Sequence, residues 1–405
     1  MAAVGAHMTG SLLRRRAASQ SGRPCTAFAL LVALIPCLWT AWPPHGFVRT
    51  RPHASSGRRS SLQVHCRSVA FFDTEGRLQR GPPPAETSTR KRVYVLVYKG
   101  QSLVRHIAGG GFEPALLSEV GASTFLSDPS CVQAWLGSPG EGPLSNIAAA
   151  VAGTGSDDVS TGICSLGFWL LDLSHLPEAP EMSDLGMSSE VTWALLRDRK
   201  GRSVCDSLVA DDYAALLGSA RGLALWHRSV PFCAKCGGRT ESHRAGRNRR
   251  CQECSERFRP RVDPSVIVLV VNGTHCLLGR KSEWPPGRFS TLAGFVEFGE
   301  TLEECVVREM REESGVAVDR QSLRFVASQP WLFPRSLMMG FTVEAPRDEP
   351  LKVDDDELEA ADWFSAEEVR AALQGTAEQN NLRSVPSKAS LARTVIESWL
   401  EGLGA

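Results

Sequence analysis

Three glutamates, Glu309, Glu312 and Glu313, lie close together in a segment with strong helix-forming composition. Their spacing of i, i+3 and i+4 puts them on one face of a helix, where three like charges repel one another. A divalent cation would relieve that repulsion. Carboxylate oxygens suit Mg²⁺ or Mn²⁺, and Mg²⁺ commonly works together with substrate phosphates. Taken alone, the same residues are more often a solvated acidic face, so both interpretations stay open at this point.

The segment around the glutamates has the start and stop signals of a single helix from Thr301 to Ser314. No Pro or Gly interrupts it, Thr301 and Glu304 resemble a capping box, and Gly315 is a typical helix stop. A buried stripe at helical spacing is expected on this helix, formed by Leu302, Val306, Val307 and Met310. The carboxylates would then be held in place by a helix that is anchored along its apolar stripe.

A longer pattern that contains the glutamates is far more specific than they are alone. It consists of Gly294, five residues, Glu300, seven residues, and then REMREESGV, which begins at Arg308 and includes Gly315. This stretch resembles the Nudix box at every defined position. The resemblance implies an α+β Nudix fold, in which a mixed β-sheet is sandwiched between helices.

The Nudix resemblance also assigns roles to the residues of the box. It implies a loop–helix–loop that binds Mg²⁺ or Mn²⁺ and hydrolyses a diphosphate linked to another moiety. Glu309, Glu312 and Glu313 would be metal ligands, and one of them could serve as the base. Glu300 and Arg308 would form an ion pair that holds the loop on the helix.

Two C-x-x-C pairs precede the box. Cys233 and Cys236 are separated from Cys251 and Cys254 by fourteen residues. Each pair places two thiolates on one side of a turn, and two such turns complete a tetrahedral four-thiolate Zn²⁺ site. Two disulfides or a dithiol redox pair are the alternatives. Four thiolates leave no position for water, so one structural zinc per chain is expected. Arg244, Arg247, Arg249 and Arg250 lie between the pairs and are expected to form a solvated tip, with contact to RNA as the alternative.

The segment after the box reads SQPWLFPRS from residue 328 to residue 336. It resembles the S-Q-P-W-P-F-P-x-S array of the NADH pyrophosphatases, and with the preceding zinc ribbon it favours that subfamily. Gln329 and Ser336 are expected to be polar substrate contacts and Trp331 a further one, although core packing is the alternative for Trp331 and Phe333. Leu332 replaces the usual Pro of the array.

The same resemblance identifies three further positions. Glu357, ahead of Trp363 and Phe364, matches a glutamate that completes the metal site, and Phe295 matches an aromatic residue that stacks on adenine. Arg259 stands where relatives often have Tyr or His, which puts an aromatic clamp in doubt. A guanidinium can still stack on a base.

The resemblance therefore implies an enzyme that hydrolyses the diphosphate of NADH or NAD⁺ to NMN(H) and AMP. Removal of NAD caps from RNA 5′ ends and a general dinucleotide or ADP-ribose pyrophosphatase activity are the alternative reactions. A non-catalytic zinc-ribbon binding module is the alternative from another class, and the intact box argues against it. The resemblance also implies a homodimer.

Charge is unevenly distributed along the 405-residue chain. The chain has 45 basic and 45 acidic residues, but its first 72 residues contain nine Arg and no acid, which leaves 36 basic against 45 acidic residues in the remainder. That balance argues against a general nucleic-acid-binding protein. The length is sufficient for two or three domains with substantial cores.

Residues 1–68 have the composition of a targeting leader. Arg14–Arg16 precede the apolar run Ala27–Trp42, as in a signal peptide, and Arg49–Ser68 is rich in Arg and Ser and free of acids, as in a transit peptide. Together they resemble the bipartite leaders of algae with secondary or tertiary plastids. We therefore expect a plastid location and no stable membrane partner for the mature protein. A mitochondrial location and a membrane anchor are the alternatives.

The rest of the chain divides into four regions. Residues 69–90 are expected to be a linker, and residues 91–228 a degenerate Nudix-like companion domain with little chemistry of its own. Residues 229–260 would form the zinc ribbon and residues 261–405 the hydrolase domain. Strands are predicted in the companion domain at Arg92–Lys99, Gly167–Ser174 and Val191–Leu196, and a helix at Asp211–Trp226.

Overall fold

The computed structural model describes residues 78–79, 91–140, 142–153, 166–196, 204–332, 335–377 and 381–404. Every described residue belongs to one compact unit, Val64–Ala405. The expected leader, most of the expected linker, and Phe333 lie outside the described residues. No helix in the described ranges is long and apolar enough to cross a membrane.

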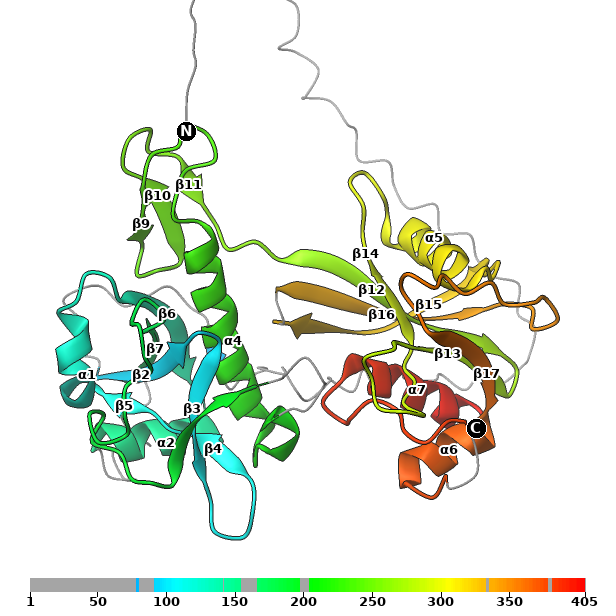
Figure 1. Ribbon diagram of the computed structural model, residues 1–405, viewed down its shortest axis with the longest axis horizontal. Coiled ribbons are helices and arrows are strands. Elements are labelled where there is room, and N and C mark those ends of the chain that lie inside the picture. Colours follow the sequence, from blue (N-terminus) through cyan, green and yellow to red (C-terminus); the bar gives the residue numbers. More distant parts are fainter. Residues whose placement is uncertain are drawn as a thin grey trace, which may run out of the picture. The chain divides into compact units, whose positions relative to one another are not determined.

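An eight-stranded mixed sheet forms the N-terminal part of the described chain (Figure 1). Its strand order is β1-β6-β7-β2-β3-β4, with β5 also pairing β2 and β8 pairing β3. The strands are β1 (Leu78–Gln79), β2 (Lys91–Tyr98), β3 (Gln101–His106), β4 (Phe112–Pro114), β5 (Leu117–Ser118), β6 (Val132–Pro139), β7 (Leu166–Asp172) and β8 (Val191–Leu195). The helices are α1 (Glu119–Leu126), α2 (Pro143–Ala152), a 3₁₀ helix (Val204–Ser207) and α4 (Asp211–Ser229). The predicted strands and the long helix are thereby confirmed.

A three-stranded sheet follows α4 and carries the cysteine pairs. Its strands β9 (Thr240–His243), β10 (Asn248–Cys251) and β11 (Arg257–Phe258) pair in the order β11-β10-β9. Cys233 and Cys236 lie in the turn before β9, where Gly237 has a positive φ of 77° that a residue with a Cβ adopts only rarely. Cys251 ends β10, and Cys254 lies in the turn that follows it.

A six-stranded sheet carries the glutamates and has the order β15-β16-β12-β13-β17, with β14 pairing β12. The strands are β12 (Asp263–Asn272), β13 (His275–Arg280), β14 (Leu292–Phe295), β15 (Asp319–Trp331), β16 (Ser336–Glu344) and β17 (Ala360–Ser365). The helices are α5 (Leu302–Ser314), α6 (Ala366–Gln374) and α7 (Leu391–Gly402). A hairpin at Asn272-Gly273 joins β12 to β13, with Asn272 opposite His275.

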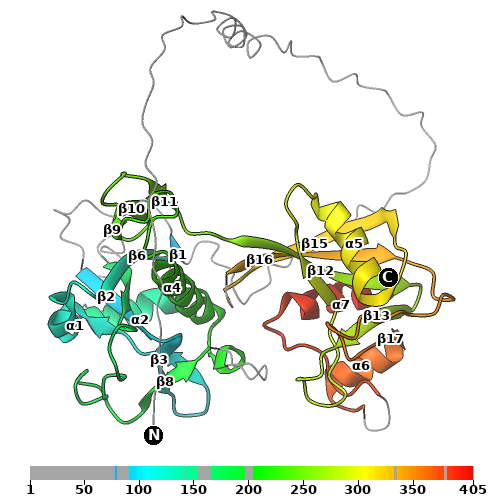
Figure 2. The same ribbon diagram turned by 45° about the horizontal axis from the view of Figure 1, so that its top comes forward.

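Helices cover both faces of this sheet (Figures 1 and 2). Cys305, Val306 and Met310 of α5 share one core with alternate β12 residues such as Val268. Leu391, Val395 and Ile396 of α7 share the other core with Ile267 and Leu269, which point to the opposite side of β12. The expectation of an α+β fold with a mixed sheet between helices is confirmed.

The two large sheets follow the same pairing scheme. Each has a central parallel pair, β2 with β7 and β12 with β16, and each places a hairpin partner beside it, β3 and β13. A short strand pairs with the first member of each parallel pair, β2 or β12, and leads into a helix, β5 into α1 and β14 into α5. Helix α1 has the sequence EVGASTFL, with a single carboxylate, so the acidic face of α5 has no counterpart on it. This scheme supports a Nudix-like companion region, while the domain boundaries themselves stay a prediction.

Candidate active site

Helix α5 lies directly against strand β14 because Gly294 has no side chain. A Cβ atom built at Gly294 would overlap the carboxyl group of Glu309, far inside the 3.0 Å that real Cβ contacts respect. Glu309 is 7% exposed, so its carboxylate is held between helix and strand. Gly294, the first glycine of the predicted box, therefore leaves the space that the Glu309 carboxylate occupies.

The ends of α5 are fixed by the local signals that the sequence predicts. Thr301 accepts a hydrogen bond from the Glu304 backbone, and the Glu304 side chain accepts one from the Thr301 backbone, which completes the capping box. Gly315 ends the helix with a φ of 74°. Leu302 and Val307 are only partly buried, and Cys305 takes their expected place in the core.

Arg308 ties the loop before α5 to the helix. Its Nε and Nη2 donate to the two oxygens of Glu300 at 2.8 and 2.9 Å, and Nη2 also donates to the Phe295 carbonyl at 2.9 Å. This hydrogen bonding lowers the pKa of Glu300 to about 2. Nη1 donates to Glu309 and Glu312, both at 2.9 Å. The expected Glu300–Arg308 pair is present, and the same guanidinium also holds two of the three glutamates.

Two of the three glutamates are buried, which a solvated acidic face would not show. Burial raises the pKa of Glu309 above its ordinary value. Glu313 is 2% exposed, and burial, followed by repulsion from Glu309 and Glu357, raises its pKa to about 8. Its Oε2 atom is buried and has no hydrogen-bond partner. A buried carboxylate oxygen without a donor is costly, and a divalent cation with oxygen ligands would satisfy it.

The carboxylate oxygens of the predicted metal residues do not all lie close enough together to bind one ion without side-chain movement. No group of three or more described glutamates has oxygens that all lie within 4.8 Å of one another. Glu312 is the exposed member, and its carboxylate is turned to Arg308. The donor chemistry fits a hard divalent ion, and Glu309, Glu312, Glu313 and Glu357 are the residues that could hold it.

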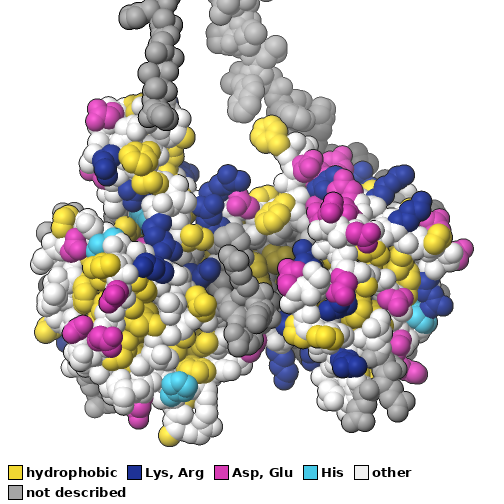
Figure 3. Space-filling model, viewed as in Figure 1, with side chains coloured by type: hydrophobic (Ala, Val, Ile, Leu, Met, Phe, Trp, Pro, Cys, Tyr) yellow, Lys and Arg dark blue, Asp and Glu magenta, His cyan; other side chains and the backbone are white. Residues whose placement is uncertain are grey.

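A cavity of about 880 Å³ opens beside the acidic face of α5. Acidic side chains gather on this part of the surface, coloured magenta over α5 in Figure 3. Glu309, Glu312 and Glu357 line the cavity, and so does Phe295, which is 56% exposed and free to meet a ligand. The structure therefore brings three of the four predicted metal residues and the predicted base-stacking residue to one cavity.

Glu313 lines a second cavity, of about 330 Å³. Trp331 lines it, together with Trp284 and Arg288 from the loop between β13 and β14. Lys281 lines both cavities. The Trp-Pro-Pro-Gly-Arg stretch at residues 284–288, which precedes β14, is the sequence signal that could have pointed to this wall.

Gln329 and Ser336 line neither of these cavities. Gln329 is 1% exposed; its side-chain amide donates to the Ala389 carbonyl, and its oxygen accepts from the Leu391 backbone, both at 2.9 Å. It thereby holds the segment that leads into α7. A direct substrate contact by Gln329 or Ser336 stays a prediction, and the hydrogen bonds favour a supporting role for Gln329.

The four cysteines of the ribbon converge. Their sulfur atoms all lie within 4.8 Å of one another, with Cys233 3.6 Å from Cys254 and Cys236 3.5 Å from Cys251. All four are free thiols at distances too long for a disulfide. Four thiolates around one point fit a tetrahedral zinc ion.

One arginine of the ribbon departs from the expected solvated tip. Arg249 donates through Nε and Nη2 to the side chain and carbonyl of Thr240, both at 2.7 Å, and its Nη1 contacts Nδ1 of His227 at 3.1 Å. His227 in turn donates through Nε2 to the Gly246 carbonyl at 2.8 Å. Arg249 therefore fastens the hairpin to α4, because its donors have buried acceptors within reach.

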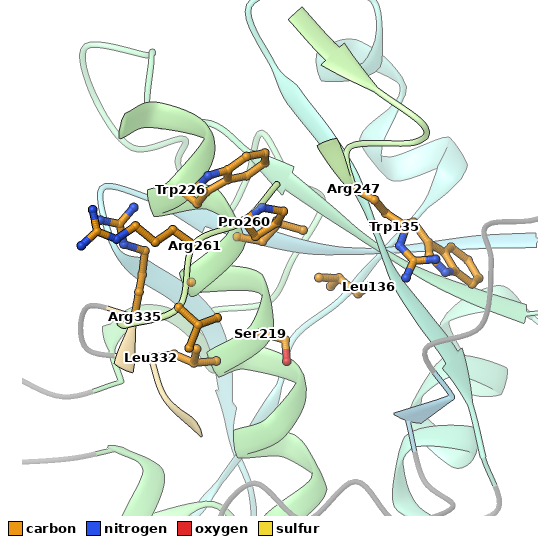
Figure 4. Close-up of a pocket in the computed structure, with 12 residues that line it drawn as sticks. Trp135, Leu136, Ser219, Trp226, Arg247, Pro260, Arg261, Leu332 and Arg335 are labelled. Carbon is orange, nitrogen blue, oxygen red and sulfur yellow. The ribbon is translucent and has the colours of Figure 1, made fainter. Parts of the chain in front are cut away.

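A further cavity, of about 310 Å³, lies along α4. Figure 4 shows Trp135 and Arg247 on one side of it, and Trp226 with Ser219 on the helix. None of the described residues that line it is acidic. It therefore offers no carboxylate chemistry comparable to that of the α5 site.

Comparison with known proteins agrees with this geometry. The NUDIX domain model matches residues 261–386. The chain is 43% identical over 197 residues to a protein of Mycobacterium bovis named NAD-capped RNA hydrolase NudC, and 41% identical over 189 residues to one of that name from Pseudomonas aeruginosa. Each match covers 47% of this chain and 62% of the relative, so the chain spans less than two thirds of these relatives.

Solved structures add little to this comparison. The crystal structure of a NUDIX hydrolase from Nitrosomonas europaea is 19% identical with a TM-score of 0.34, and the match covers 42% of this chain and 91% of that one. A likeness this low carries no argument. What the family model shows is a domain: the chain carries a NUDIX domain at residues 261–386.

Proposed function

We propose that this protein hydrolyses the diphosphate linkage of NADH or NAD⁺, free or at the 5′ end of RNA, with Mg²⁺ or Mn²⁺ at the acidic face of α5. The observation that carries the proposal is the pair of buried carboxylates, Glu309 and Glu313, with the unpartnered Oε2 of Glu313, beside a large open cavity. Such an arrangement costs stability in the free protein and is therefore expected to serve binding of a cation and of phosphates.

Residues that line the two cavities beside α5 would have different roles in the reaction. A divalent ion held by Glu309, Glu312, Glu313 and Glu357 would supply an activated water and neutralise charge that develops on the phosphates. Arg308 orients Glu309 and Glu312 through its Nη1 hydrogen bonds. Lys281, on the wall of both cavities, is placed to face the diphosphate. Phe295 in one cavity and Trp331 in the other offer ring faces for the two halves of a dinucleotide.

Two substrates have support from different observations. The paired aromatic walls suit any dinucleotide, and the S-Q-P-W array supports NADH. The relatives' name, NAD-capped RNA hydrolase, favours NAD-capped RNA, which has the same diphosphate. Either reaction adds water across the linkage and releases AMP, or the AMP-ended RNA, with NMN(H).

The other parts of the proposal concern the metal in the ribbon, the assembly and the location. We propose one structural Zn²⁺ in the four-cysteine cluster, because convergent free thiols leave no open ligand position. A homodimer and a plastid location follow from the resemblances stated above, and they remain proposals. Analytical ultracentrifugation and a fluorescent fusion of residues 1–90 would test them.

The deciding experiment is turnover of the purified protein on NADH, NAD⁺, ADP-ribose and NAD-capped RNA, with Mg²⁺ or Mn²⁺. We expect NMN(H) and AMP from the free dinucleotides and release of NMN from the capped RNA. Hydrolysis of ADP-ribose at a higher kcat/KM than all the NAD substrates would refute the proposed selectivity. No hydrolysis of any of the four would refute the proposed reaction.

A further inference from the structure

Three side chains with different metal-binding atoms meet in the N-terminal region, away from the NUDIX domain. Asp128 and Cys131 lie in the turn between α1 and β6, and His175 follows β7. Strands β6 and β7 are antiparallel neighbours with Val132 opposite Asp172, so the turn and the segment after β7 emerge side by side. Sequence reasoning did not find this cluster, because Cys131 and His175 are 44 residues apart in the chain.

The donor atoms of these residues face one another. Nε2 of His175 lies 2.9 Å from Oδ2 of Asp128 and 4.0 Å from Sγ of Cys131, and the three donors all lie within 4.8 Å of one another. In a tetrahedral zinc site with Zn–N and Zn–O near 2.0 Å and Zn–S near 2.3 Å, neighbouring ligand atoms are about 3.3–3.6 Å apart. The two separations from His175 lie within about 0.6 Å of these values, and the third is no more than 4.8 Å, so side-chain adjustments would suffice to bind an ion.

Local hydrogen bonds fix the Asp128–Cys131 turn and the orientation of the Asp128 carboxylate. The Cys131 backbone donates to the Asp128 carbonyl at 3.1 Å, which closes the turn. The other carboxylate oxygen of Asp128, Oδ1, accepts from the Ser130 backbone at 2.8 Å, so Oδ2 is the oxygen left for His175. Such a second hydrogen bond to a ligating carboxylate is the usual support for a metal ligand.

The geometry differs from a nucleophile–base–carboxylate arrangement. In such an arrangement the thiol and the carboxylate contact different nitrogens of the imidazole ring, since one accepts a proton while the other is oriented. Here Asp128 and Cys131 both face Nε2 of His175. A shared nitrogen fits donors that converge on one cation.

We infer that Asp128, Cys131 and His175 form a second metal site, which takes a borderline-soft divalent ion such as Zn²⁺. One thiolate, one imidazole and one carboxylate are the ligand types that zinc accepts, and the thiolate and imidazole disfavour Mg²⁺ and Ca²⁺. The sulfur side of the site is buried, while the side chains of His175 and Asp128 are 26% and 37% exposed. Water from the open side would complete four ligands. The ordinary alternative is a surface ion pair beside an unrelated buried thiol.

The test is the metal content of the full chain, purified with Zn²⁺ and freed of loosely bound ions. We expect about two zinc ions per chain in the wild type, one from the four-cysteine cluster and one from this site. His175→Ala and Cys131→Ser should each lose one zinc and keep the other. Cys233→Ser should lose only the ribbon zinc. His243→Ala is the matched control, because His243 lies in β9 outside both clusters and should leave the metal content unchanged.

Cobalt distinguishes the two sites even if one variant is unstable. With Co²⁺ in place of Zn²⁺, the difference between the wild-type and His175→Ala absorption spectra should be that of a site with a single thiolate. One zinc per chain in the wild type would overturn the inference, and so would a second zinc that survives both His175→Ala and Cys131→Ser. A change in unfolding temperature without loss of metal would mean that the cluster is an ion pair only.

Discussion

Replacing Gly294 by Ala should remove most of the activity while the protein stays folded. The new Cβ would overlap the Glu309 carboxyl group, and restoring even the shortest real Cβ separation of 3.0 Å requires that group to move by at least about 1 Å. A misplacement of that size at a catalytic group can cost about 10² in rate, or about 2.7 kcal/mol of transition-state stabilisation. The overpacking itself should cost about 1–3 kcal/mol of stability.

The assay is hydrolysis of NADH with Mg²⁺ at saturating substrate, normalised to the folded fraction measured by thermal unfolding. Gly402→Ala is the matched control, because a Cβ there meets nothing within 4 Å and the backbone needs no positive φ. It should leave kcat unchanged and stability within about 1 kcal/mol of the wild type. If Gly294→Ala keeps more than about a third of the wild-type kcat, the close approach of β14 to Glu309 does not set the position of the site.

Three other predictions follow from burial and hydrogen bonding. Glu313→Gln should lower kcat by about 10² or more. It should also raise the unfolding temperature of the metal-free protein at about pH 7, because burial raises the pKa of Glu313 to about 8 and the folded chain must protonate a carboxyl that the unfolded chain leaves charged; an unchanged unfolding temperature would contradict the burial argument. Gln329→Ala should lower the unfolding temperature and reduce kcat/KM for NADH and ADP-ribose alike, because both ends of the amide bind the backbone before α7; a loss for NADH alone would reveal a substrate contact. His227→Gln should flatten the pH dependence of stability. Burial lowers the pKa of His227 to about 4, so the unfolded chain binds more protons between about pH 4 and 6.5, and wild-type stability should fall by up to ~3 kcal/mol as pH drops through that window. Urea unfolding of both proteins at pH 7 and pH 5 measures this, and equal changes in the two would refute it.

The parts of the site that sequence predicts are those governed by short-range rules. The capping box at Thr301 and the stop at Gly315 depend on residues within a few positions of each other. The Glu300–Arg308 pair spans eight residues, and the loop brings the two together. The paired cysteines meet because each C-x-x-C turn sets its own geometry. In each case the separation of the residues along the chain limits the local conformations in which they can meet.

The parts that sequence did not predict depend on which segments the fold brings together. Gln329 has the polarity of a substrate contact, but its partners, Ala389 and Leu391, are about sixty residues away. Arg249 lies in an arginine-rich hairpin that is typical of a solvated tip. Its partner His227 belongs to the preceding helix, α4, 22 residues away in the chain. The pairing scheme shared by the two large sheets has no local sequence signature, because strand order is set by pairing between distant segments. Helix α1 also lacks the three glutamates that identify α5 in the sequence.

The charge around the α5 site indicates why a cation is needed before any phosphate can bind. The residues that line its cavity include only two basic side chains, Lys281 and Arg308. The acidic ones number eight: Glu283, Glu297, Glu309, Glu312, Asp355, Asp356, Glu357 and Glu359. Eight negative and two positive charges leave a formal charge of −6, and Arg308 is already shared among Glu300, Glu309 and Glu312.

A dinucleotide brings a further negative diphosphate to this cavity, so the free protein would repel its own substrate. Divalent ions would reverse that relation, because each adds two positive charges beside the acidic side chains of the cavity. Arg308 offsets only part of the negative charge, since its Nη1 already donates to Glu309 and Glu312. We therefore expect the dinucleotide to bind together with its divalent ions.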